Sequence, residues 1–485
     1  MKFSKILIAA ALVGTVSCTK YDFGDYNNNP APDRTQNPQT SSLLTNAIWG
    51  SVRGLTLTDF NSDLYAQYLS EIQYPGVSLY QNPQSDWSGY YAGPLEDYQT
   101  IINLNTSTPS ASNVAGNGDN ASQIAIAKIM KAYLFAQVTD RWGDVPFSQA
   151  LSSTNRTPQY DAQATIYQGI INMLKEGVNG FGNGAAVKGD ILFNGDASKW
   201  KKFANSLRMI LAMRAVKADQ NFAKTEFLSA YNDAAGHITT NADNPNFTFP
   251  GGGFNNPYYD NFSTRTDYAV SKTFVDIVQG VSSSDPRLPN MITKPGANFK
   301  GAPYGWERAS ITAWLSSNQD YGVPSARITA INATLPLITA AEVLFVQAEA
   351  AAYGWIPANN AADYYNAITQ SMGRWGVTNQ AAINTYLADP NVSIGTSYGT
   401  GALAKIYTQK YIDLFMNGPE AWFEWRRTGY PALTPARDAV NASKKIPRRL
   451  MYPTSEVGVN RVNYNAAVSN LTGGDTQDSR VWWDR

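Results

Sequence analysis

Apolar side chains recur every three or four residues in four long segments, and this spacing constrains the fold more than any other feature of the chain. In the first segment Ile126, Ile129, Met130 and Tyr133 share one side of a helix, and the pattern recurs over 200–214, 338–352 and 403–415. Such a repeat predicts amphipathic helices packed on a core. Shorter helices are expected near 43–72, 94–105, 161–177, 222–234, 268–279 and 359–374. The fold class is therefore predicted to be mainly α, with few short strands.

Long aperiodic segments separate these helices, at 74–93, 107–120, 236–266, 284–332 and 430–465. They are rich in Gly, Pro, Asn and aromatic residues, and loops of this length usually carry function. No linker-like composition divides the chain after residue 41. We therefore expect one domain over 41–485, in which a scaffold of helical pairs presents long irregular loops.

The N-terminus predicts export and lipid attachment. Lys2 and Lys5 precede an apolar run over 6–16 that leads to Cys18, the one cysteine of the chain. This run has the length of a signal-peptide core and is too short to span a bilayer. We expect residues 1–17 to be a lipoprotein signal peptide, Cys18 to carry the lipid, and 18–40 to form a flexible tether. The alternative is an ordinary signal peptide with a chance cysteine, because Thr15 stands where bacterial lipoproteins usually carry Leu.

The composition narrows the class of partner. Lys plus Arg and Asp plus Glu each number 38, so the net charge is zero and nucleic-acid binding is not expected. Charged residues make up only 16% of the chain and aromatic residues 12%. A surface of neutral polar groups and rings suits an uncharged polar ligand such as a glycan.

The inventory of catalytic residues is small. His237 is the only histidine, so a zinc site built from His and Cys is not expected, and no metal or other cofactor is predicted. A glycosidase needs only two carboxylates. Glu420 and Glu424 lie four residues apart, on one face of a helix, beside Arg426 and Arg427. Because a neighbouring arginine lowers the pKa of a carboxyl whereas a catalytic acid needs a raised one, structural ion pairs are the favoured interpretation.

Five segments in order carry a family resemblance. They are 128–147, which ends in Gly-Asp-Val-Pro-Phe, then 200–214, 342–350, 409–415 together with 424–429, and 446–453. In these segments the chain resembles the SusD/RagB family of nutrient-binding outer-membrane lipoproteins of Bacteroidetes. The resemblance implies a SusD-like fold of tetratricopeptide-like helical pairs with large loop insertions. It also implies a binding protein rather than an enzyme.

The resemblance further implies a location and a partner. The protein is expected on the outer membrane, facing the cell exterior, and Asp22 and Asp25 look like the export cue of such lipoproteins. The expected partner is a SusC-like TonB-dependent transporter, over which the protein acts as a hinged lid. The ligand is expected to be an oligosaccharide. Peptide capture, a surface glycoside hydrolase using Glu420 and Glu424, and a purely structural lid are the alternatives.

Two loops correspond to those that supply ligand-binding aromatics in carbohydrate-binding members of the family. The candidate ligand-binding residues are Tyr80, Asn82, Asp86, Trp87 and Tyr91 from the first loop, and Tyr304, Trp306, Arg308 and Trp314 from the second. Trp87 and Trp306 are the best stacking candidates, because indole offers the largest flat face. The alternative is that these rings fix the loops to the scaffold.

Overall fold

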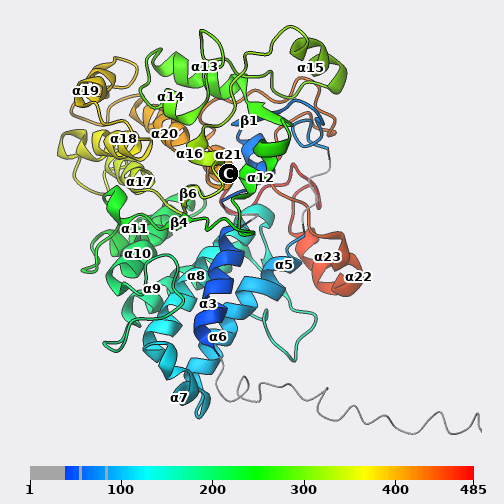
Figure 1. The fold of residues 1–485 in the computed structure, drawn as a ribbon. Coiled ribbons are helices and arrows are strands. Elements are labelled where there is room, and N and C mark those ends of the chain that lie inside the picture. The colour runs from blue at the N-terminus through cyan, green and yellow to red at the C-terminus, as the bar shows by residue number, and fades with distance from the viewer. Residues whose placement is uncertain (1–38, 54–56, 82–85) are drawn as a thin grey trace, which may run out of the picture.

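The computed structural model describes residues 39–53, 57–81 and 86–485, and Figure 1 shows their arrangement. Cys18 and Asn82, two of the predicted site residues, lie outside the described residues. The chain is mainly helical, as the periodicity predicted. Among the described residues, no helix is both long enough and apolar enough to cross a membrane.

The scaffold consists of helices that pack in sequential pairs, α8 with α9, α10 with α11, α17 with α18 and α20 with α21. Contacts of α10 with α9 and with α17 join the pairs, as expected of a tetratricopeptide-like arrangement. The bounds are α8 Asn120–Trp142, α9 Gln163–Asn179, α10 Ala197–Arg214, α11 Gln220–Tyr231, α17 Ala340–Ala352, α18 Ala362–Arg374, α20 Ala402–Asp413 and α21 Gly418–Thr428. Each of the four predicted long segments lies almost entirely within one of these helices.

Side-chain caps explain where the scaffold helices begin. Asp119 accepts a hydrogen bond from the Ser122 amide at 2.8 Å before α8, and Asp196 accepts one from the Ser198 amide at 2.9 Å before α10. Thr339 accepts from the Glu342 amide at 2.9 Å before α17. These bonds satisfy amides that have no partner inside the helix.

The remaining helices border the scaffold or lie within the long segments. Those that border it are α3 Thr40–Val52, α4 Phe60–Tyr65, α6 Glu96–Thr106, α13 Lys272–Val281 and α19 Gln380–Ala388. Those within or overlapping the segments predicted to be irregular are α5 Ser88–Tyr90, α7 Ser110–Val114, α12 Pro257–Thr264, α14 Leu288–Met291, α15 Arg308–Leu315, α16 Ala326–Thr329, α22 Thr454–Val459 and α23 Arg461–Ser469. Short 3-10 or π turns add η2 Tyr91–Leu95, η3 Ala115–Asn117, η4 Asn241–Asp243 and η5 Asn359–Ala361. The long segments thus contain helices too short for a periodicity argument to detect.

The strands of the described chain form antiparallel pairs of two or three residues. They are β1 Leu69–Glu71 with β5 Tyr268–Val270, β2 Val145–Pro146 with β3 Tyr160–Asp161, and β4 Asn246–Thr248 with β6 Thr334–Pro336. Each pair joins segments that are far apart or separated by a loop. The strands therefore pin the long segments to one another and to the scaffold.

The core is continuous between early and late parts of the chain. Trp142, Trp200, Trp422 and Trp483 are all fully buried in it. Trp483 donates a hydrogen bond from its indole nitrogen to Asp140 of α8 at 2.7 Å. The C-terminal segment is therefore part of the scaffold's interior.

Candidate functional site

A segment near residue 436 brings the two predicted ligand loops together. Tyr80 of the first loop accepts a hydrogen bond from the Ala436 amide at 2.9 Å. Gly305 of the second loop has φ +64°, and a Cβ placed on it would lie 2.3 Å from the Ala436 side chain. Only glycine fits this approach without displacing the loop.

Two of the predicted rings in these loops are buried. Tyr80 is 1% exposed and Tyr304 is 9% exposed, and burial raises the pKa of Tyr80 to about 12. Their hydroxyls and rings lie within the structure rather than at its surface. For these two tyrosines the structure favours the interpretation that they fix the loops.

Trp87 lies in a nest of rings. It is 4% exposed and its ring centroid is 5.4 Å from that of Trp142 and 5.7 Å from those of Tyr160 and Tyr452. The neighbouring Tyr91 donates its hydroxyl hydrogen to the Pro146 carbonyl at 2.5 Å. These contacts hold the end of the first loop, although both rings also line a hollow of about 490 Å³.

Asp86, at the start of the same segment, is exposed and has a local role. Its carboxylate accepts hydrogen bonds from the Ser88 amide at 2.8 Å and from the Ser88 hydroxyl at 2.6 Å. These bonds stabilise the turn into α5. The carboxylate faces solvent beyond them.

A different set of rings lies at the surface around α15. Trp306 and Trp314 are half-buried and pack on Ile72, Ala269, Ala302 and Ile311. We call this surface the α15 face and define it by Tyr74, Trp306, Arg308 and Trp314. Figure 1 shows α15 at one end of the molecule, away from α5 and α23.

Cations flank each ring of the α15 face. The Arg308 guanidinium lies 4.9 Å and that of Arg265 5.5 Å from the ring centroid of Tyr74. The Arg437 guanidinium lies 4.2 Å from the Trp306 ring, and the Lys300 ammonium lies 5.6 Å from the Trp314 ring. Arg308 also donates to the Gln73 carbonyl, which ties α15 to the loop that carries Tyr74.

Three of these four cations have a carboxylate partner. Arg265 pairs with Asp267 at 2.5 Å, Arg437 with Asp438 at 2.5 Å and Lys300 with Asp320 at 2.6 Å. The α15 face is therefore close to charge balance despite its cations. It presents rings and hydrogen-bonding groups, which suits an uncharged polar ligand.

Tyr74, Arg265 and Arg437 were not among the residues predicted for a ligand site. Tyr74 is 62% exposed, more than Tyr430, which is 44% exposed. Tyr74 lies at the first position of the segment 74–93, which was predicted to be an irregular loop. That position was the only feature of the sequence that could have indicated a role in binding. Its contact with Arg308 joins positions too distant in the chain for spacing to reveal.

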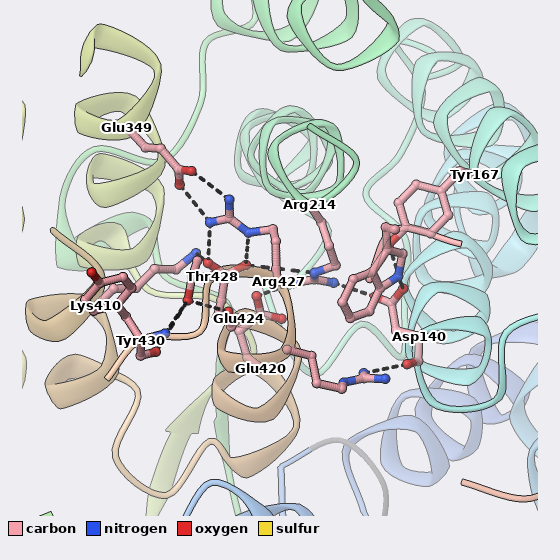
Figure 2. Close-up of polar contacts among 12 residues, drawn as sticks. Asp140, Tyr167, Arg214, Glu349, Lys410, Glu420, Glu424, Arg427, Thr428 and Tyr430 are labelled. Atoms are coloured by element: carbon pink, nitrogen blue, oxygen red, sulfur yellow. Dashed lines mark hydrogen bonds and ion pairs between the residues drawn. The ribbon is translucent and has the colours of Figure 1, made fainter. Parts of the chain in front are cut away.

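The two candidate glycosidase carboxylates lie inside the scaffold, as Figure 2 shows. Arg214 of α10 contacts both Asp140, at 2.5 Å, and Glu420. Arg427 joins Glu424, at 2.7 Å, to Glu349, at 2.6 Å, and Lys410 lies 3.1 Å from Glu424. We call this set the buried ion cluster.

The electrostatics of the buried ion cluster do not suit acid catalysis. Burial alone would raise the pKa of Glu424, but Arg427, Lys410 and Arg214 together hold it well below its usual value. The hollow beside Glu424 measures about 10 Å³, roughly the space of one water molecule. The interpretation of Glu420 and Glu424 as structural ion-pair partners is therefore favoured, and a sugar ring has no room beside them.

One carboxyl of this region has a raised pKa. Burial, together with the neighbouring Glu420, raises the pKa of Glu342 well above its usual value. The rise favours the neutral form of Glu342, as expected of a carboxyl buried beside Glu420. Among the described residues, no group of three or more His, Cys, Asp or Glu side chains is placed to hold a metal ion.

Comparison with known proteins places the chain in a family. Residues 32–453 match the SusD-like family model described as starch-binding associating with outer membrane. A chitin-binding protein is 26% identical, with a TM-score of 0.78 over 92% of this chain and 100% of its own. A chitin-binding SusD homolog from Flavobacterium johnsoniae is 25% identical, with a TM-score of 0.75 over 91% of this chain and 98% of its own.

A SusD homolog from Parabacteroides distasonis is also similar, at 26% identity and a TM-score of 0.77 over 93% of this chain and 98% of its own. A search of the curated protein sequences gave no match. The chain belongs to the SusD-like family of outer-membrane-associated nutrient-binding proteins.

Proposed function

We propose that this protein captures an uncharged oligosaccharide on the α15 face. The observation that carries the proposal is the exposed Tyr74, which Arg308 links to α15, together with the half-buried Trp306 and Trp314 around that helix. Exposed rings stack on the apolar faces of sugars, and guanidinium and amide groups bond sugar hydroxyls. The chitin-binding relatives support a neutral glycan of that kind.

The mechanism is binding without bond cleavage. Packing on Ile311 and the cation contacts hold Tyr74, Trp306 and Trp314 in place before the ligand arrives, so little side-chain entropy is lost on binding. Arg308 uses one nitrogen on the Gln73 carbonyl, and its other N–H groups remain available for sugar hydroxyls.

We further propose that the protein is anchored to the outer membrane through Cys18 and faces the cell exterior. In this proposal the tether over 18–40 lets the domain over 41–485 act as a lid on a SusC-like TonB-dependent transporter. The family's association with the outer membrane supports this location. Incorporation of labelled palmitate, and its loss in Cys18→Ala, tests the anchor; co-purification of the barrel with the tagged protein tests the partner.

Titration calorimetry with chito- and malto-oligosaccharides tests the binding site. Tyr74→Ala and Trp306→Ala should each weaken binding about 3- to 10-fold, the effect of losing one stacked ring. Phe254→Ala is the matched control, because Phe254 is 55% exposed on a different loop. Absence of binding by any neutral glycan, or equal affinity in all variants, would contradict the proposal.

Peptide capture is the second candidate. The positive charges of Arg265, Arg308 and Arg437 would attract acidic peptides if no carboxylate neutralised them. Because Arg265 and Arg437 are paired with Asp267 and Asp438, the structure favours the neutral glycan. Binding of an acidic peptide that is abolished by Arg308→Ala, with no glycan binding, would reverse this preference.

A further inference from the structure

A second hollow lies between the scaffold and the β4–β6 pair. It measures about 320 Å³, at the lower end of the range of about 300–1,000 Å³ typical of small-molecule sites. Arg327 of α16 and Arg374 and Trp375 at the end of α18 line it, together with Asn241, Asn244 and Asn246. None of the ten residues that line it is acidic.

Arg327 is the unusual group of this hollow. Its guanidinium lies against the backbone of Gly376, where a Cβ would fall 2.0 Å from one of its nitrogens. Within the described part of the chain, the Arg327 guanidinium has neither an ion-pair nor a hydrogen-bond partner. On the α15 face, by contrast, Arg265 and Arg437 each have a carboxylate. Arg327 thus leaves an unneutralised positive charge at the mouth of the hollow.

Arg374 adds a second cation with capacity to spare. Its guanidinium lies 4.6 Å from the Trp375 ring and donates to the Asp413 carbonyl at 2.5 Å. The Asp413 carboxylate is 3.6 Å from it and also accepts from Thr339 at 2.7 Å. Since a guanidinium has five N–H donors, several of those on Arg374 remain free.

The rest of the lining supplies an apolar floor and a polar rim. Ile328, Leu335, Pro336 and the Trp375 ring form the apolar part. Asn246 is exposed, and its side-chain amide bonds to no other residue within the described part of the chain. Asn241 and Asn244 are held by bonds to the Gln370 carbonyl and to each other, at 2.8 and 3.2 Å. Such a lining matches a compact ligand with one negative group, hydroxyls and an apolar face.

We propose that this hollow binds the carboxylate of an acidic sugar, a uronate, with the carboxylate on Arg327 and Arg374 and the ring against Trp375. Planar guanidinium groups match the two oxygens of a carboxylate, and asparagine amides bond sugar hydroxyls. The site is separate from the α15 face and does not depend on the function proposed for that face. The protein would then bind neutral glycans at the α15 face and acidic sugars in this hollow.

Calorimetric titration of the full chain with methyl glucuronide tests the site, and methyl glucoside serves as its neutral twin. The glucuronide should bind at least about 10-fold more tightly than the glucoside, the size expected of a charge-assisted contact. Its affinity should be lower at about 0.5 M salt than at about 0.05 M salt, because salt screens the charges. Arg327→Gln should lower the affinity for the glucuronide about 10-fold, because one charge-assisted contact is lost. Since Arg327 is exposed, the substitution leaves no buried charge behind and the fold should be retained. Arg461→Gln, an exposed arginine of α23, is the matched control and should change nothing.

Two further variants test the proposal independently of Arg327. Asn246→Ala should lower the affinity for the glucuronide. It should leave unchanged the affinity for an N-acetylated dipeptide that has a free carboxylate but no sugar hydroxyls. Trp306→Ala should leave glucuronide binding intact, which separates a failure here from a failure at the α15 face. Equal binding of glucuronide and glucoside, equal binding of the dipeptide and the glucuronide, or full affinity in Arg327→Gln would each overturn the proposal.

Discussion

The same pair of residue types, arginine over tryptophan, occurs in the interior and at the surface of this molecule. Inside, Arg426 lies 3.9 Å from the Trp422 ring and donates to the carbonyls of Arg448 and Asp140, each at 2.6 Å. On the α15 face, Arg437 lies 4.2 Å from Trp306 with its side chain 45% exposed. Burial lowers the pKa of Arg426 to about 9. The residue pair alone therefore does not indicate a ligand site; solvent access and free donors do.

Removing a buried arginine should have the largest effect on stability. Arg214→Met leaves Asp140 and Glu420 as buried carboxylates without their main partner. The expected loss is about 3–5 kcal/mol of unfolding free energy, measured by urea denaturation. Lys272→Met, which removes an exposed pair with Asp276, is the control and should cost under about 1 kcal/mol. Similar losses in both variants would show that burial does not distinguish the two classes of pair.

Two tryptophans that were predicted to be alike should behave differently. Trp87→Ala removes a ring packed on Trp142, Tyr160 and Tyr452 and should cost about 3–5 kcal/mol of stability. Trp306→Ala removes a half-buried ring and should cost well under half as much while weakening glycan binding. Calorimetric melting of both variants tests this; a larger melting-temperature loss in Trp306→Ala would contradict it.

A buried carboxyl gives a pH-dependent prediction. Burial raises the pKa of Asp63 from 3.8 to about 8, while its bond from the Tyr258 hydroxyl, at 2.6 Å, opposes that rise. The folded state therefore holds a proton that the unfolded state has lost above pH 4. The corresponding stability is complete below about pH 4 and is lost as the pH rises through about 8.

Asp63→Asn should remove this dependence, because an amide cannot ionise. We expect the variant to gain several kcal/mol relative to wild type at pH 9, at about 1.4 kcal/mol for each unit of the pKa shift, and to gain almost nothing near pH 4. Urea titrations at the two pH values measure the difference. An equal change at both would mean that the substitution acts through packing rather than ionisation.

The smallest effect should come from the exposed half of the comparison. Arg437→Ala removes the guanidinium over Trp306, a contact worth about 0.5–1 kcal/mol at an exposed site. Glycan affinity should fall about 2- to 5-fold, with no measurable change in melting temperature. A large loss of stability would place Arg437 with Arg426 as an internal brace.

The sequence allowed the scaffold to be predicted because its helices are long enough to show a repeat. It predicted α8, α10, α17 and α20, whereas α15 and α16, of eight and four residues, were placed in an irregular segment. Trp306, Arg308 and Trp314 were predicted as ligand-binding residues, and this stays a prediction. In the structure the two tryptophans pack near Ile311, and Arg308 contacts Tyr74.

What could not be predicted depends on contacts between distant segments. Trp87 is buried because Tyr160 and Tyr452 cover it, and neither residue is near it in the chain. Tyr74 becomes a candidate only because Arg265 and Arg308 reach it. Periodicity reports which face of an element is apolar but not which distant segment covers a loop.

The bond from Trp483 to Asp140 has a consequence for how the protein is made. Asp140 lies on α8 and its partner is 343 residues later. At about 5–20 residues per second of synthesis, roughly 20–70 s pass between the emergence of the two. During that interval the interior around α8 lacks an indole that it later encloses. Under the export proposed above, such a delay would keep the first helices from completing their packing while synthesis continues.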